Sequence, residues 1–281
     1  MSDNELRGAS QTLLMTLFLH ALDARAARPI LGDRYAAPIL DHVPHDHLRL
    51  ELLRGNRAII CARARVIDDA VRAFLDAHPD AVVLHLGCGL DSRVLRIDPG
   101  PQVTWLEVDQ PKVISIREAV YAARPGVTSI AASVPDSHWW SQIPSGRPLL
   151  TIAEGLFMYL KPAQVRATLH QLAGLAGSPH TLLADTTAGW VSRASRMLPI
   201  NIALGASFAS TTADFGAAVR HTGAFHTTSS TSLITAAARL ASGPDAVVMR
   251  AAVRLPAVRK GLLLHTLRGG DPHLDAVPTV E

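Results

Sequence analysis

The sequence has few cysteines and no apolar run long enough to cross a membrane. Only two cysteines, Cys61 and Cys88, occur among 281 residues, so no disulfide framework is indicated and we expect a reducing, cytoplasmic location. The apolar run at residues 13–22, LLMTLFLHAL, follows acidic residues instead of a basic cluster, which argues against a secretion signal. A membrane span takes about 20 apolar residues. We therefore expect an amphipathic N-terminal helix in this segment.

Runs of charge of one sign are also lacking. The 27 Lys and Arg residues are scattered among 24 Asp and Glu residues, and aromatic residues make up only 5% of the chain. We expect neither a nucleic acid nor a membrane as a partner. Internal repeats and low-complexity tracts are absent as well. The composition leaves a homodimer open, and its 48% of hydrophobic residues is enough for a sizeable core.

What the sequence does contain is an alternation of apolar runs and helical periodicity. The expected strands cover 81–86, 103–108, 127–131, 148–153 and 180–184, and the expected helices between them cover 91–97, 112–123 and 162–175. Several strands are continuous apolar runs, as in sheets covered by helices on both faces. The pattern predicts a doubly wound α/β fold with a mostly parallel sheet.

Four regions follow from this pattern. Residues 1–56 are expected to form an N-terminal helical lid, with helices near 10–26 and 35–41, and residues 57–190 the α/β core. Residues 191–260 are expected to form a variable substrate cap and late core elements, including helices near 213–221, 230–241 and 245–254. Residues 261–281 are expected to form a closing edge strand and a tail.

Glycine or polar residues stand at the carboxyl end of each expected strand: Gly87, Glu107 with Asp109, Ser133, Glu154 and Asp185. In open α/β sheets the ligand crevice lies outside these strand ends. Strands also end in polar residues simply because loops are polar. As a set, the residues favour a nucleotide-type ligand.

The stretch LHLGCGLDSR, residues 84–93, narrows the choice of ligand. Gly87 and Gly89 allow close approach of the backbone, and Asp109, 20 positions beyond Gly89, suits a ribose diol. NAD and S-adenosylmethionine both carry that diol. A dinucleotide site favours a third glycine, but Ser92 stands there, after the acidic Asp91. The loop therefore favours S-adenosylmethionine over NAD.

Arg63 lies on the apolar stripe of a helix expected from Arg57 to Leu75. A buried guanidinium needs an anion, because an unpaired buried charge is costly. The partner is either a carboxylate of the core or the carboxylate of a bound methionine moiety, unless the side chain reaches solvent at the edge.

Four motifs together resemble one family. In order they are RARVIDDAVRAFL from Arg63, VVLHLGCGLDSRVLRI from Val82, WLEVDQPKVI from Trp105 and IAEGLFMYL from Ile152. Over roughly residues 10–190 the chain is similar to the leucine carboxyl methyltransferase family, and its N-terminal part is more similar to the small-molecule branch that includes polyketide O-methyltransferases. The resemblance implies a seven-stranded, Rossmann-like class I methyltransferase fold.

The resemblance also implies site residues. The cofactor S-adenosylmethionine, which leaves as S-adenosylhomocysteine, would contact Arg63, Gly87, Cys88, Gly89, Asp109, Ser133, Val134 and Glu154. Arg63 would hold the methionine carboxylate, and Glu154 would lie near the ammonium group. The family commonly has an acidic residue at the position of Ser133, so adenine recognition differs here. Tyr159 and Trp190 are expected to face the substrate.

No catalytic residue is assigned. A carboxylate acceptor needs no general base, whereas a hydroxyl acceptor would benefit from one, and His138, His221 and His226 are candidates. The segment DHVPHDH, residues 41–47, is expected to be a polar loop over the site and not a metal centre.

The sequence therefore predicts an S-adenosylmethionine-dependent O-methyltransferase that acts on a carboxyl or hydroxyl group of a small secondary metabolite. Two alternatives stay open: a protein C-terminal carboxyl methyltransferase, and a non-catalytic module that binds S-adenosylmethionine.

Overall fold

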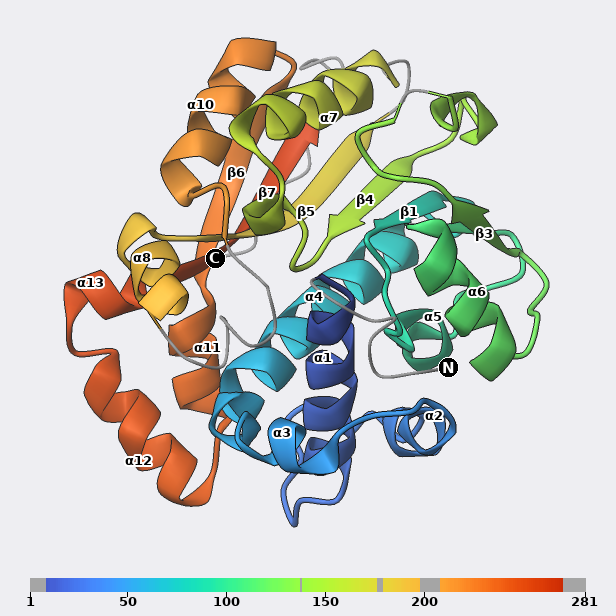
Figure 1. Ribbon diagram of the computed structural model, residues 1–281. Helices are drawn as coiled ribbons and strands as arrows, with labels where there is room; N and C mark the ends of the chain where they lie inside the picture. The colour runs from blue at the N-terminus through green and yellow to red at the C-terminus, as the bar shows by residue number, and fades with distance from the viewer. Residues whose placement is uncertain (1–8, 137, 176–178, 198–207, 270–281) are drawn as a thin grey trace.

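A seven-stranded sheet forms the centre of the protein (Figure 1). The computed structural model describes residues 9–136, 138–175, 179–197 and 208–269. The strands are β1 (Val82–Leu86), β2 (Thr104–Asp109), β3 (Val127–Ala131), β4 (Leu149–Ala153), β5 (His180–Thr187), β6 (Phe225–Ser232) and β7 (Leu262–Gly269), in the order β3-β2-β1-β4-β5-β7-β6. The first five pair in parallel, and β7 is antiparallel to β5 and β6. The predicted doubly wound, mostly parallel sheet is confirmed.

Helices cover both faces of this sheet. They are α1 (Ala9–Ala24), α2 (Ala36–His42), α3 (His47–Glu51), α4 (Arg57–Ala77), α5 (Arg93–Ile97), α6 (Pro111–Val120), α7 (Pro162–Gly174), α8 (Gly189–Met197), α10 (Thr212–Thr222), α11 (Leu233–Leu240), α12 (Gly243–Ala252) and α13 (Pro256–Arg259). Helices α7 and α10 pack together, and so do α4 and α11 (Figure 1). Among the described residues, no helix is both long and apolar enough to cross a membrane.

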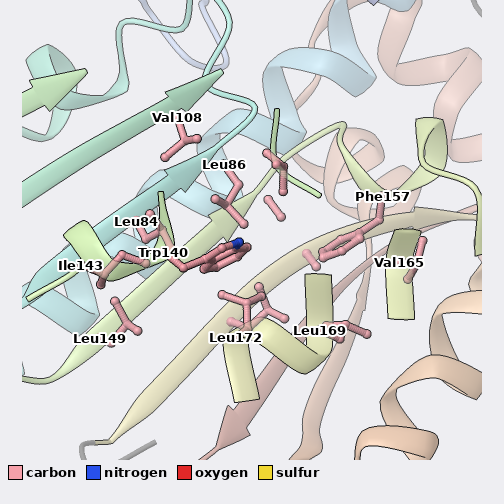
Figure 2. Packing of buried hydrophobic residues seen from close by; sticks show 14 of the residues in the cluster. Leu84, Leu86, Val108, Trp140, Ile143, Leu149, Phe157, Val165, Leu169 and Leu172 are labelled. Carbon is pink, nitrogen blue, oxygen red and sulfur yellow. The ribbon is translucent and has the colours of Figure 1, made fainter. Parts of the chain in front are cut away.

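One face of the sheet packs against α7 and the segment that carries Trp140. Figure 2 shows Leu172 of α7 beside Trp140, and both belong to the apolar cluster that also contains Leu169 of α7, Leu84 and Leu86 of β1 and Leu149 of β4. Both leucines of α7 are fully buried, and burying a leucine side chain contributes about 1.5–3 kcal/mol. This contact sets the distance of α7 from the sheet. It thereby also positions the segment between β4 and α7.

The opposite face packs against α4. Its buried residues Ile60, Ala64, Ile67 and Val71 recur at steps of three or four, which places them on one side of the helix. Ile67 and Val71 join the same apolar cluster as Trp105 of β2. Because Arg63 lies on this buried side as well, the packing of α4 directs its guanidinium toward the carboxyl end of the sheet.

The N-terminal helices form a separate apolar cluster, in which Leu17 and Phe18 of α1 join Ile39 and Leu40 of α2. The chain between α1 and α2 is fixed by a buried carboxylate. Asp23 accepts hydrogen bonds from the backbone N–H groups of residues 30–32 at 2.8–3.1 Å, and from Arg57 Nη1 at 2.9 Å. These bonds attach the end of α1 to the start of α4.

Two features near the C-terminus differ from the sequence-based expectation. The strand predicted from residue 261 as a closing edge is β7, but it lies inside the sheet between β5 and β6. The edge is β6, FHTTSSTS, which is exposed along most of its length and therefore lacks the apolar residues that predict a strand. The helix expected from 230 begins at Leu233, after this strand. The predicted tail at 270–281 and part of the predicted cap, 198–207, lie outside the described residues.

Candidate functional site

The strand order reverses between β1 and β4, and a cavity of about 270 Å³ lies at the carboxyl ends of these strands. Its walls come from α1, the glycine loop after β1, the end of β2 and residues 154–160 after β4. This is where an open α/β sheet binds its ligand. The sequence-predicted residues Arg63, Gly87, Cys88, Gly89, Asp109, Glu154 and Tyr159 all line it.

The glycine loop turns sharply under the cavity. Gly87 and Gly89 have φ values of 63° and 53°, in the left-handed region that glycine adopts most readily. A Cβ atom at Gly87 would lie 3.2 Å from Leu156 Cδ1, so the loop and the segment after β4 are in close contact. Any side chain here would intrude between the two walls.

Asp109 is placed at the end of β2 with its carboxylate against the glycine loop. Its Oδ2 accepts from the Gly89 backbone N–H at 2.8 Å, and its Oδ1 accepts from the Gln110 N–H at 2.7 Å. Burial raises the pKa of Asp109, although these two bonds and Arg117 favour the ionised form. A carboxylate that lines a cavity in this way suits a pair of ribose hydroxyl groups.

Arg63 has anionic partners, as its position on the apolar stripe of α4 predicts. Its Nε donates to Glu154 Oε1 at 2.7 Å, and its Nη1 donates to Asp185 Oδ2 at 3.2 Å. The core ion pair foreseen as one alternative is therefore present. Arg63 also lines the cavity, so contact with a bound carboxylate stays a prediction for it.

Asp91 differs from its expected environment. The sequence suggests an uncompensated negative charge at the start of a helix, but Asp91 pairs with Arg93 Nη1 at 3.1 Å and Arg96 Nη1 at 2.6 Å. Burial opposes ionisation of Asp91, yet these two guanidinium groups hold its pKa well below the usual range. Because the charge is compensated, Asp91 by itself is no argument against a phosphate-bearing ligand.

A buried ion-pair network adjoins the cavity, and three of its members, Arg63, Asp91 and Glu154, line it. It joins the guanidinium groups of Arg63, Arg93 and Arg96 with the carboxylates of Asp33, Asp68, Asp91, Glu154 and Asp185. Burial opposes ionisation of Glu154, but Arg63 and Arg93 lower its pKa to about 2. Carboxylates outnumber guanidinium groups in this network, which suits a ligand with positive charge.

Three predicted site residues do not line this cavity. Ser133 is half-buried, and its backbone carbonyl accepts from Trp139 Nε1 at 3.2 Å. Val134 is buried in the apolar cluster that contains Trp139 and Trp140. Trp190 is 42% exposed and donates to the Ala257 carbonyl, so its contacts are with the C-terminal helices.

None of the histidines weighed as bases lines the cavity either. His138, His221 and His226 are all exposed. The segment 41–47 runs from the end of α2 to the start of α3, and no residue of it contributes to the cavity. The Nδ1 atoms of His42 and His45 lie 2.7 and 2.8 Å from the carbonyl oxygens of Pro38 and Val43.

Two cavity residues, His20 and His85, are functional candidates that the sequence did not indicate. His20 belongs to α1 and follows Thr12 and Thr16 at steps of four residues, a spacing that puts all three on one side of the helix. That spacing is readable in the sequence, but only once α1 is known to cover the cavity. His85 lies on β1, where a continuous apolar run conceals which residues face the site.

Comparison with known proteins decides the family. The model of the leucine carboxyl methyltransferase family matches residues 13–173. The chain belongs to this family. It is 39% identical over 203 residues to the tetracenomycin polyketide synthesis O-methyltransferase TcmP of Streptomyces glaucescens, covering 72% of this chain and 75% of that protein.

Further relatives agree. The S-adenosyl-L-methionine-dependent methyltransferase dpfgK of Gibberella zeae is 33% identical over 182 residues, which are 59% of this chain and 61% of that protein. The fold is shared with a crystal structure of a candidate methyltransferase from Thermobifida fusca YX, at a TM-score of 0.56 and 17% identity, covering 94% of this chain and 99% of that one. The protein is an S-adenosylmethionine-dependent methyltransferase. Its membership of this family favours the enzyme over the alternative of a non-catalytic module that binds S-adenosylmethionine.

The residues present fit this cofactor. The glycine loop leaves space that a Cβ atom would fill, a carboxylate stands at the end of β2, and the cavity lining carries an excess of carboxylates. S-adenosylmethionine matches these features, because its nucleoside can lie against the glycine loop, its ribose hydroxyls can donate to the carboxylate after β2, and its sulfonium group carries a positive charge.

Proposed function

We propose that the protein is an O-methyltransferase that modifies a carboxyl or hydroxyl group of a small, polyketide-like metabolite. The observation that carries this proposal is the 39% identity to a polyketide O-methyltransferase across 75% of that protein's length. The cavity supports it, because helix α1 covers it and several apolar side chains line it, among them Leu13, Met15 and Leu156. A covered, partly apolar site suits a small molecule better than a chain terminus.

In this proposal Gly87, Cys88 and Gly89 lie beneath the cofactor, and Asp109 accepts from the ribose hydroxyls. Arg63 and Glu154 stand at the methionine end, where Arg63 still has guanidinium N–H groups beyond the two that reach Glu154 and Asp185. Ser133 and Val134 are assigned to the adenine side by family resemblance alone.

S-adenosylmethionine supplies a methyl group that its sulfonium sulfur has already activated. The protein has to align the acceptor with that methyl group and exclude water. Tyr159, which lines the cavity close to Arg63, is suited to position the acceptor. Burial raises the pKa of Tyr159, so the phenol stays protonated and can donate a hydrogen bond.

The proposal is tested in two steps. Isothermal titration with S-adenosylhomocysteine and NAD should give binding of the first and none of the second. The protein is then incubated with S-adenosylmethionine carrying a labelled methyl group and a panel of aromatic acids, phenols and peptides with a free C-terminus. Label in a small-molecule ester or ether supports the proposal, whereas label only in peptide carboxyl groups would establish the protein-directed alternative.

A further inference from the structure

A second cavity lies between helix α10 and the edge strand β6, which run close together (Figure 1). Its volume is about 320 Å³, and its walls come from α10, from β6 and from His265 of β7. Among the described residues, none lines both this cavity and the one assigned to the cofactor. Pockets that hold small organic ligands start at about 300 Å³. The cavity between α10 and β6 is therefore large enough for a small organic molecule.

The inner wall of this cavity is apolar. Phe215 and Val219 of α10 and Phe225 of β6 line it, and all three side chains are buried. The Phe215 ring stacks on the His265 imidazole with 5.5 Å between the ring centroids. A wall of two phenyl rings and a valine suits an aromatic ring or a short alkyl chain.

The polar part of the lining is a row of hydrogen-bonded hydroxyl groups that passes through His265. Its Nδ1 lies 2.8 Å from Ser230 Oγ and its Nε2 lies 2.9 Å from Thr186 Oγ1, which in turn lies 2.8 Å from Thr212 Oγ1. Burial lowers the pKa of His265, so the imidazole is neutral at neutral pH and carries one proton. With that proton on Nδ1, His265 donates to Ser230, and the hydroxyl hydrogen of Ser230 is left for a ligand in the cavity.

The charge of the lining is positive. The exposed Arg220 lines the cavity and has no carboxylate partner among the described residues, and no described Asp or Glu lines the cavity. The one acidic residue of α10, Asp214, accepts from the Thr211 N–H at 2.9 Å and from Thr211 Oγ1 at 2.8 Å, so it caps the helix. An anionic group in the cavity would therefore meet a guanidinium and no opposing carboxylate.

Gly216 leaves the space that such a group needs. It lies in the middle of α10, one turn before Arg220, where a glycine costs about 1 kcal/mol of helix stability relative to alanine. A Cβ atom at Gly216 would lie 3.5 Å from Arg220 Nη1. The guanidinium thus lies over the part of the cavity that a larger side chain at Gly216 would fill.

We propose that this cavity binds a small organic anion, whose aromatic or alkyl body packs against Phe215 and Phe225 and whose carboxylate accepts from Arg220 and Ser230. This site is additional to the cofactor and acceptor sites of the proposed function. The alternative occupant is an extended peptide that adds a strand to β6. A register shift between Thr227 and Ser229 interrupts the ladder of β6, and such an irregularity at an edge strand hinders pairing with a further strand.

The test uses isothermal titration of the full chain, with S-adenosylhomocysteine present, against 3-phenylpropionate and against its uncharged amide. We expect the acid to bind about tenfold more tightly than the amide, the ratio that one charge-assisted hydrogen bond gives. Arg220→Gln should lower the affinity for the acid to that for the amide. Arg166→Gln, which changes an exposed arginine of α7, is the matched control and should keep the difference.

A second pair of variants locates the bound acid. Gly216→Leu places a side chain in the cavity and should abolish binding of the acid and the amide. Ala217→Leu changes the adjacent, exposed residue, which does not line the cavity, and should alter both affinities less than about twofold. Leucine favours helix, so both variants should retain α10.

Three results would overturn the proposal: no binding of the acid to the unaltered protein, equal affinities for the acid and the amide, or equal affinities in the two leucine variants. Binding of an acetylated hexapeptide of valine and threonine in place of the acid would overturn it in favour of strand addition to β6.

Discussion

The Asp109 carboxylate is bonded to the backbone N–H of Gly89 at 2.8 Å, and this bond joins the end of β2 to the loop after β1. The carboxylate that is expected to recognise the ribose is thus held by the loop that is expected to lie under the same cofactor. Neither part can shift without the other, which makes the floor of the site a single preorganised unit.

Replacing Asp109 should reduce the affinity for the cofactor more than it reduces the folding stability. We expect Asp109→Ala to weaken S-adenosylhomocysteine binding at least tenfold, because two ribose hydroxyls lose a charged acceptor. Glu118→Ala, an exposed position on α6, is the matched control and should bind like the unaltered protein. Titration calorimetry measures both, and equal affinities in the two variants would remove Asp109 from the site.

The same residue predicts how binding depends on pH. Burial raises the pKa of Asp109 above the ordinary value of 3.8, and only the ionised form accepts through both oxygens. Affinity for S-adenosylhomocysteine should therefore decrease as the pH falls through this raised pKa, at a higher pH than for an exposed aspartate. Asp109→Asn should flatten the dependence between neutral and mildly acidic pH. A profile identical in both proteins would assign the effect to another group.

Glu154 is expected to contribute to stability in addition to its proposed place at the methionine end of the cofactor. Glu154→Gln removes the charge between Arg63 and Arg93, and breaking a buried ion pair typically costs about 3–5 kcal/mol of unfolding free energy. The pKa of Glu154 is lowered to about 2 from an ordinary 4.5, so its stabilisation is present above pH 4.5 and is lost as the pH falls toward 2. Urea unfolding at several pH values should show the two proteins converging in acid. A constant difference would argue against this origin.

Gly87 offers a test of the glycine loop. An alanine there meets both a left-handed backbone and Leu156 Cδ1 at 3.2 Å. Gly146 has a similar φ of 79° but nothing within 4 Å of an added Cβ, so Gly146→Ala reports the backbone penalty alone, about 1–2 kcal/mol. We expect Gly87→Ala to destabilise more than its control and to be the only one of the two that loses cofactor binding. Equal cofactor affinity in the Gly87→Ala and Gly146→Ala variants would mean that the loop accommodates a Cβ atom at Gly87 without loss of binding.

The core of the fold could be predicted because its signals are local. The mostly apolar sequence of strand Val82–Leu86 and the apolar stripe that carries Ile67 both predict burial from the local sequence alone. Strand β6 could not be predicted in this way. It is a polar edge strand whose pairing with β7 depends on chain far away in sequence.

In the candidate site, too, the residues at strand ends could be predicted from the sequence, whereas contacts that depend on tertiary packing could not. Gly87, Asp109 and Glu154 stand at strand ends, where the α/β fold itself brings them together. The partners of Arg63 lie 91 and 122 positions away in the chain, and the environment of Asp91 depends on two arginines whose direction only the packing of α5 sets. For Trp190, in contrast, the prediction of a substrate contact rests only on its position after the core, and in the structure Trp190 contacts the C-terminal helices.

Helix α1 supplies Thr12, Leu13, Met15, Thr16, Leu17 and His20 to the cavity, and it is joined to the rest of the protein by side-chain contacts and not by strand pairing. A helix held in this way can separate from the sheet while every strand stays paired. We therefore expect S-adenosylhomocysteine to dissociate at a rate set by how often α1 separates from the sheet. The backbone amide hydrogens of α1 should also exchange with solvent more slowly when this product is bound.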